Sequence, residues 1–162
     1  MRATGERLPL RLRWRLWWLA RTLPVAVRRR SLLELLRQAT PAAADPHWRP
    51  SAPAAVAPVL AAVARPWRMR GRRCLREGLL AYRFLRLGGH PAVIHFGVLA
   101  GGAPGERTRA HCWVSVAGEV LVNPPEAEGG GRRMVELFRF DGAACDPRGR
   151  RLGALPSVAF AD

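Results

Sequence analysis

The pattern of hydrophobic and polar residues changes near the middle of the chain. In the first half, apolar residues recur at the three- and four-residue spacing of helices. Ser31 and Glu34 form a capping-box pattern, Gly88 and Gly89 form a helix stop, and Pro24 predicts a break in the first helix. Helices are predicted within residues 1–30, from the Ser31 cap to about Gln38, over 54–64, and from Cys74 to Leu87.

In the second half, short segments either are rich in β-branched residues or alternate between apolar and polar residues, as strands do. Ala117 and Gly118 form a tight turn that pairs two of these segments as a hairpin. Helices followed by successive strands indicate an α+β fold with a small antiparallel sheet. Strands are predicted over residues 92–99, 111–116, 119–123 and 134–140.

The length and apolar content are those of a folded domain. A chain of 162 residues with 49% hydrophobic residues can bury a substantial core as one compact unit. Within that unit we expect a basic helical region over residues 1–50 and the core over residues 51–162.

The charge is strongly positive. The 27 basic residues are all arginine, against 12 acidic residues, for a formal net charge of +15. Part of this excess matches the codon bias of a GC-rich genome, because Ala, Gly and Pro are also abundant. The positive field still favours acidic peptides, nucleic acid or anionic lipid as partners. The arginines are spread along the chain without a nucleic-acid-binding motif, so we expect no specific nucleic acid partner.

The predicted helix within residues 1–30 interleaves arginines with Trp14, Trp17 and Trp18. One interpretation is that it packs on the domain, with arginine stems covering apolar surface. The other is that its surface meets a lipid headgroup or a partner protein, which makes it a candidate for peripheral membrane contact.

Three cysteines, Cys74, Cys112 and Cys145, are present, and no pair has the spacing of a zinc site. An odd number without a framework argues against structural disulfides and favours a reduced, cytoplasmic location. No phosphate-binding loop and no His/Cys set with ligand spacing occurs, so we expect no cofactor and no metal.

Cys74, His111 and Asn123 are the candidate catalytic residues. A cysteine in the first turn of a helix lies near unpaired N–H groups and the positive end of the helix dipole, which favour the thiolate. The hairpin should bring His111 and Asn123 close together on adjacent strands, where Asn123 can orient the imidazole. Taken singly, each has an ordinary explanation as a buried cysteine, a packed histidine and a strand end. In this order they are the parts of a cysteine hydrolase.

The segment from Cys74 to Asn123 resembles the transglutaminase-like, papain-like fold, and more narrowly the leader peptidases (B proteins) of lasso peptide biosynthesis. That family has a helix-start cysteine, a leucine-rich helix, a Gly turn, a Pro-Ala-x-Ile-x-x-Gly-Val strand, a His-Ala-Trp-Val-Glu strand and a hairpin ending on aspartate. The matching residues are Cys74 and residues 79–87, 88–90, 91–98, 111–115 and 118–123.

The resemblance implies a sheet packed on the cysteine-bearing helix and a cysteine peptidase that removes the leader from a ribosomally synthesised lasso precursor peptide. Cys74 would attack the scissile carbonyl, His111 would transfer the proton, and Asn123 would orient His111. Backbone N–H groups at the start of the helix would form the oxyanion hole. A leader-recognition protein and an ATP-dependent lasso cyclase are the implied partners. The chain has no room for the recognition domain, so that partner is expected in trans.

The chain departs from the family pattern at three positions. Asn123 replaces aspartate, and its side chain can accept a hydrogen bond from the imidazole but cannot stabilise an imidazolium by charge. Cys112 replaces alanine and is expected to be inert, because it alternates to the face opposite His111. Ser115 replaces glutamate, and the sequence assigns it no role. Two alternatives remain: a transglutaminase-like acyl transferase, and a non-catalytic, basic homologue that binds peptide or nucleic acid.

Overall fold

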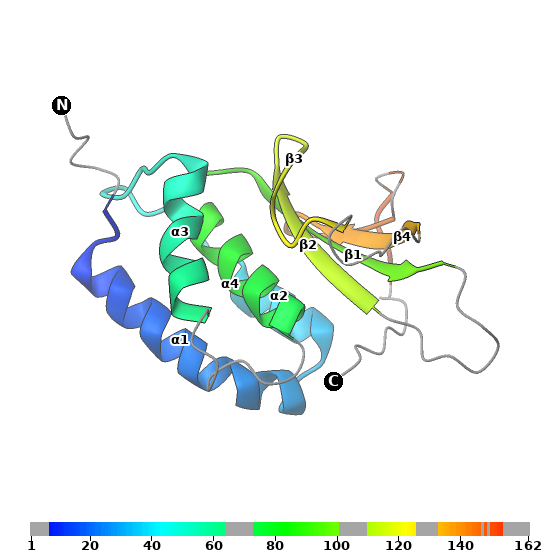
Figure 1. Ribbon diagram of the computed structural model, residues 1–162, viewed down its shortest axis with the longest axis horizontal. Helices are drawn as coiled ribbons and strands as arrows, with labels where there is room; N and C mark the ends of the chain where they lie inside the picture. Colours follow the sequence, from blue (N-terminus) through cyan, green and yellow to red (C-terminus); the bar gives the residue numbers. More distant parts are fainter. Residues whose placement is uncertain are drawn as a thin grey trace.

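A layer of helices packs against an antiparallel sheet in the computed structural model (Figure 1). The structure describes residues 7–63, 73–100, 110–125, 133–146, 148 and 150–153. Helices precede strands along these ranges, which confirms the α+β fold class. The elements are α1 (Leu10–Arg29), α2 (Leu32–Ala39), α3 (Ala52–Val63), α4 (Arg73–Leu87), β1 (Ala92–Leu99), β2 (Ala110–Val116), β3 (Glu119–Val122), β4 (Met134–Phe140) and β5 (Ala144–Cys145).

Helix α4 occupies the centre of the molecule, with the other three helices on one side and strands β1 and β2 on the other (Figure 1). Nearly all of its side chains are buried because it has neighbours on both sides. Phe84 receives the buried Trp48 ring edge-on, with 6.1 Å between the ring centroids. On the sheet, Phe96 and Phe138 stack at 4.6 Å. Burying aromatic and aliphatic surface on both sides of α4 fixes where its first residues, including Cys74, lie.

The predicted helix ends agree with the structure at two places. At the start of α2, the Ser31 side chain accepts a hydrogen bond from the Glu34 N–H, and the Glu34 carboxylate accepts one from the Ser31 N–H. At the end of α4, Gly89 adopts a φ of +86°, a left-handed conformation that glycine enters without strain. Both ends were recognisable because capping depends on residues close in sequence.

The predicted break at Pro24 is wrong, because α1 continues to Arg29. Proline removes one N–H donor from the helix, a local cost that usually ends or kinks it. Here Leu16 and Ala20 before the proline and Val27 after it are all buried on the inner face. Packing of that face holds both halves in one helix despite the missing hydrogen bond.

The sheet has the strand order β3-β2-β1-β4-β5, and all its described pairs are antiparallel. The tight turn between β2 and β3 is confirmed, since Ala117 and Gly118 both have positive φ, as a type I′ hairpin turn requires. Strand β5 was not predicted, because two residues carry no detectable alternation. Along the described ranges, no helix has both the length and the apolar character needed to cross a bilayer.

Candidate active site

Cys74 lies in the first turn of α4, as the sequence predicted, and its side chain is half-buried. The first N–H groups of a helix have no partner within it, and Cys74 is the second residue of α4 as the structure describes it. The residues just before Arg73, including Gly71 and Arg72, lie outside the described residues. The thiol is thus placed at the positive end of a buried helix dipole.

The imidazole of His111, at the start of β2, is hydrogen-bonded to the Cys74 thiol. Its Nε2 lies 3.0 Å from the main-chain oxygen of Asn123. A carbonyl oxygen only accepts, so Nε2 carries a proton and Nδ1 is left to face the sulfur. The structure therefore brings the predicted cysteine and histidine together, with the ring in the tautomer that can exchange a proton with Cys74.

Asn123 reaches both residues, but not through the contact expected from sequence. Its main-chain carbonyl, rather than its side-chain oxygen, accepts the hydrogen bond from His111. Its side-chain Nδ2 instead donates to the main-chain oxygen of Cys74 at 3.1 Å. Asn123 has a φ of +53°, a conformation that asparagine tolerates better than most residues. Left-handed backbone at the end of β3 directs the carbonyl toward His111 and leaves the amide free to brace Cys74.

Cys112 contacts Cys74, although the sequence predicted that Cys112 would be inert. It does lie on the opposite face of β2 from Trp113, but that face packs on α4, where Gly78 makes room for it. A Cβ at Gly78 would stand 3.0 Å from the Cys112 sulfur. The Cys112 thiol donates a hydrogen bond to the main-chain oxygen of Cys74 at 3.0 Å, and it also lies within hydrogen-bonding reach of the Cys74 sulfur. A glycine in the middle of a buried helix, one turn after Cys74, was the available sign of a close approach.

The pKa of Cys74 is lowered to about 5. The largest cause is the hydrogen bond from the Cys112 thiol, followed in the same direction by the hydrogen bond and charge of His111, while burial opposes both. Burial raises the pKa of Cys112 well above its usual value, so Cys112 remains a neutral donor. Cys74 is therefore the member of the pair that ionises, and it is a thiolate at neutral pH.

Glu77, one turn after Cys74, is a buried carboxylate beside the thiolate. Burial raises its pKa, and Arg73, whose Nε is 3.8 Å from the carboxylate, opposes that rise. The Cys74 thiolate adds to the increase. A carboxyl with a raised pKa carries less negative charge near the sulfur when the pH is low, which limits its repulsion of the thiolate.

Removing the Cys112 donor should shift the reactivity of Cys74 toward higher pH. In a Cys145→Ser background, we expect Cys112→Ala to raise the midpoint of the pH profile for alkylation of Cys74 by iodoacetamide above the wild-type value near 5. Cys112→Ser keeps a hydroxyl donor and should leave the midpoint close to that of the background. An unchanged midpoint in Cys112→Ala would show that His111 alone sets the pKa.

A second group of polar side chains supports His111 from the far side of Trp113. The Trp113 ring stacks on His95 at 5.3 Å and on His111 at 6.3 Å between centroids. His95 Nδ1 lies 3.0 Å from the Glu136 carboxylate, and its Nε2 lies 2.7 Å from the Ser115 hydroxyl. Because His95 is held at both ring nitrogens, Trp113 has a fixed surface on which to stack. The role of Ser115 is therefore to help hold the His95 ring in place. His95 and Glu136 were not recognisable from the sequence as supporting residues, because they lie far along the chain from Cys74 and His111.

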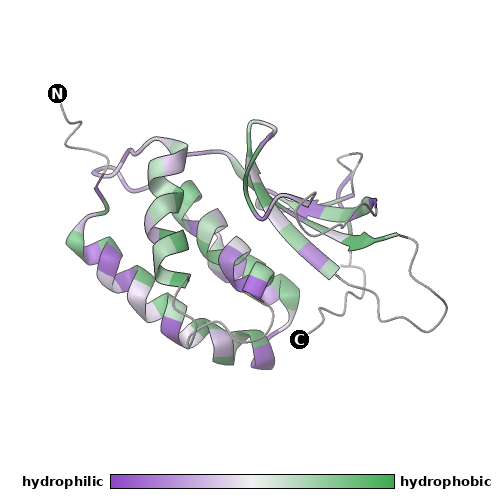
Figure 2. Cartoon of the chain, in the orientation of Figure 1, coloured by the Kyte–Doolittle hydropathy of each residue, from purple (hydrophilic) through white to green (hydrophobic). Residues whose placement is uncertain are grey.

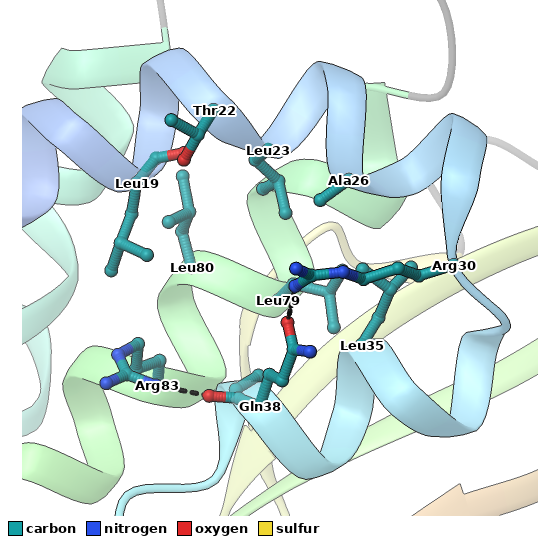
Figure 3. A pocket seen from close by; sticks show the side chains of 11 residues that line it. Leu19, Thr22, Leu23, Ala26, Arg30, Leu35, Gln38, Leu79, Leu80 and Arg83 are labelled. Atoms are coloured by element: carbon teal, nitrogen blue, oxygen red, sulfur yellow. Dashed lines mark hydrogen bonds between the residues drawn. The ribbon is translucent and has the colours of Figure 1, made fainter.

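A separate cavity lies among the helices, away from the Cys74 site. It has a volume of about 90 Å³ and is lined by apolar side chains of α1, α2 and α4 (Figure 3). Arg30 and Arg83 both donate hydrogen bonds to Gln38 at its edge (Figure 3). None of Cys74, His111 and Asn123 lines it. Among the residues that the structure describes, no three His, Cys, Asp or Glu side chains are arranged to hold a metal ion.

Comparison with known proteins identifies a family. No curated protein and no solved structure showed a significant match to the chain. The family model described as "Transglutaminase-like superfamily" matches residues 8–135, a range that spans the helical layer, the Cys74 helix and the hairpin that carries His111 and Asn123. The match covers most of the chain, and enzymes of this superfamily are cysteine peptidases and acyl transferases. The chain belongs to the transglutaminase-like superfamily.

Proposed function

We propose that the protein is a cysteine peptidase that removes the leader from a ribosomally synthesised lasso precursor peptide. The observation that carries the proposal is the Cys74 thiol beside His111 at the start of α4, with its pKa lowered to about 5. A thiolate paired with an imidazole is the nucleophile of such enzymes. The narrower assignment rests on the sequence resemblance between residues 74–123 and the lasso leader peptidases.

In the proposed first step, the Cys74 thiolate attacks the scissile carbonyl carbon and a tetrahedral oxyanion forms. The N–H of Cys74, at the positive end of α4, can stabilise the negative charge on that oxygen. His111 donates the proton on Nδ1 to the leaving amine, and the carbon–nitrogen bond breaks. The products of this step are the free amine of the core peptide and a thioester between Cys74 and the leader.

In the second step, water attacks the thioester and His111 Nδ1 takes its proton. The carbon–sulfur bond breaks, the leader leaves as a carboxylic acid, and the thiolate is restored. Throughout, the Asn123 carbonyl holds Nε2 at 3.0 Å, so the ring keeps one orientation while Nδ1 exchanges its proton. The new amino terminus of the core peptide is the nucleophile that an ATP-dependent cyclase can then acylate. A leader-recognition protein is the proposed partner that delivers the precursor.

The test is cleavage of a lasso precursor by the purified protein in the presence of a leader-recognition protein encoded beside it. Mass spectrometry should detect the leader with a free carboxyl terminus and the core peptide with a free amino terminus. Cleavage at random sites, or of unrelated peptides at the same rate, would support a general peptidase instead. No cleavage with a correctly paired precursor and recognition protein would contradict the proposal.

The contacts of Asn123 give a sharper prediction. Asn123→Gly keeps the main-chain carbonyl and tolerates the positive φ, so His111 should stay oriented. We expect kcat to fall by less than about tenfold, because only the hydrogen bond from Nδ2 to Cys74 is lost. Where a side chain orients the imidazole, replacing it costs about 10⁴ in kcat, so a loss above about 10³ would contradict this role.

Asn123→Asp should be more harmful than Asn123→Gly. A carboxylate would replace the amide donor that lies 3.1 Å from the Cys74 carbonyl oxygen, so two acceptors would face each other, and its charge would disfavour the nearby thiolate. An Asn123→Asp variant faster than wild type would show that the carboxylate reaches the imidazole, as in the family pattern.

The second candidate function is acyl transfer to an amine, which proceeds through the same thioester. The geometry of Cys74 and His111 serves both reactions, because only the second nucleophile differs. Adding a primary amine to the cleavage reaction separates them: an acyl transferase yields the leader amide as the main product, and a peptidase yields the acid.

A further inference from the structure

We propose that the outer face of α1 binds the surface of an anionic lipid bilayer. The helix lies at the outside of the helical layer, with α3 and α4 covering only its inner face (Figure 1). Leu12, Leu16, Ala20 and Val27 fill that inner face and are buried. The surface includes none of Cys74, His111 and Asn123, so the inference does not depend on the proposed function.

The outer face of α1 exposes large apolar side chains that an ordinary solvated helix would not carry. Leu10, Trp14 and Trp18 are 68%, 66% and 61% exposed, and Val25 is 51% exposed. Their spacing places them on one side of the helix, with Trp17 beside Trp14 at 5.7 Å between ring centroids. Elsewhere in the described chain, the exposed large apolar residues are isolated ones such as Leu60, Val120 and Val135. The row on α1 is thus an exposed apolar surface along one side of the helix.

The charges on α1 all have one sign. Its sequence contains six arginines and no acidic residue, and Figure 2 shows the strongly hydrophilic positions alternating with apolar ones along the helix. Arg11 is turned to an ion pair with Asp45 at 2.7 Å, whereas Arg21 lies over the Trp17 ring at 5.5 Å. Arg28 and Arg29 are exposed at the carboxyl end. The exposed arginines of α1 can contact anions with their guanidinium groups while their stems lie along apolar surface.

A bilayer fits this surface better than a folded partner does. Binding energy between proteins is concentrated where aromatic anchors enter pockets, but here the tryptophans stand on the convex side of a single helix. The cavity that α1 helps to line lies between α1, α2 and α4, and no tryptophan of α1 lines it. Tryptophan prefers the headgroup region, and arginine pairs with lipid phosphate while its stem stays in apolar surroundings. At a rise of about 1.5 Å per residue, the row from Leu10 to Val25 is about 22 Å long. A row of this length can lie flat on a membrane surface.

The experiment is co-sedimentation of the full chain with vesicles of phosphatidylcholine and phosphatidylglycerol, compared with vesicles of phosphatidylcholine alone. We expect binding to the anionic vesicles and much weaker binding to the neutral ones, with the difference reduced at high salt. Trp14→Ser/Trp18→Ser should weaken binding to anionic vesicles at least about tenfold. These side chains are mostly exposed, so the fold should be retained, and Val135→Ser serves as the matched apolar control that binds like wild type.

A charge-matched pair tests the arginines independently of the tryptophans. Arg21→Gln/Arg28→Gln should weaken binding and flatten its salt dependence, whereas Arg133→Gln/Arg148→Gln removes the same charge elsewhere and should have little effect. The proposal is overturned if wild type does not prefer anionic vesicles, or if both arginine pairs weaken binding equally. It is also overturned if the tryptophan variant binds as wild type does, or if the protein binds DNA but not vesicles.

Discussion

Cys74→Ala is expected to abolish peptide cleavage, with a loss of at least about 10³-fold in kcat. The substitution removes the thiol that is hydrogen-bonded to His111, and alanine supplies no nucleophile for the acyl intermediate. The measurement is the rate of precursor cleavage together with iodoacetamide labelling at pH 6. Wild type should be labelled at Cys74 because a thiol with a pKa of about 5 is mostly ionised at that pH.

The rate of cleavage should depend on pH in a definite direction. The lowered pKa means that the thiolate predominates above about pH 5 and is lost as the pH falls through that value, so cleavage should decline on the acid side there. Cys145→Ser is the matched control, since Cys145 is on β5, three strands from β2 in the sheet order, and its loss should leave cleavage intact. Cleavage by Cys74→Ala at the wild-type rate would show that another residue is the nucleophile.

Gly97→Ala is expected to have the largest effect on stability. A Cβ at Gly97 would stand 2.7 Å from the main-chain oxygen of Val135 and 3.0 Å from the Trp113 ring. The first contact is with backbone of the paired strand β4, where the register shifts between Phe96 and Gly97, so neither partner can move without disturbing the sheet. Overpacking of this kind should lower the free energy of unfolding by about 2–3 kcal/mol and the melting temperature by about 4–10 °C.

Circular dichroism during thermal and urea unfolding measures this effect. Gly153→Ala is the matched control, because a Cβ there meets no atom within 4 Å. If Gly97→Ala melts at the same temperature as Gly153→Ala, the close approach of β1 and β4 is not as described. The folded Gly97→Ala protein should also cleave its substrate more slowly than wild type. The added methyl group would displace Trp113, which stacks between His95 and His111, and so would disturb the His111 ring.

The sequence by itself indicated most of the elements and the order of the candidate catalytic residues. The strand predicted over residues 92–99 from its β-branched residues corresponds to β1 residue for residue, and the Ser31 capping box marks the start of α2. These features depend on neighbours a few residues apart, so local pattern is sufficient to find them. The placement of Cys74 in the first turn of a buried helix followed in the same way.

Only the tertiary structure decided which atoms meet. The sequence assigned the orienting role to the Asn123 side chain, yet the main-chain carbonyl performs it, because β3 ends in a left-handed residue after a register shift between Val114 and Ser115. Cys112 donates a hydrogen bond to the main-chain oxygen of Cys74 because β2 packs on α4 at Gly78. Continuation of α1 through Pro24 likewise depends on burial of its inner face. Each outcome is set by packing between distant segments, which fixes side-chain distances that no local pattern along the chain encodes.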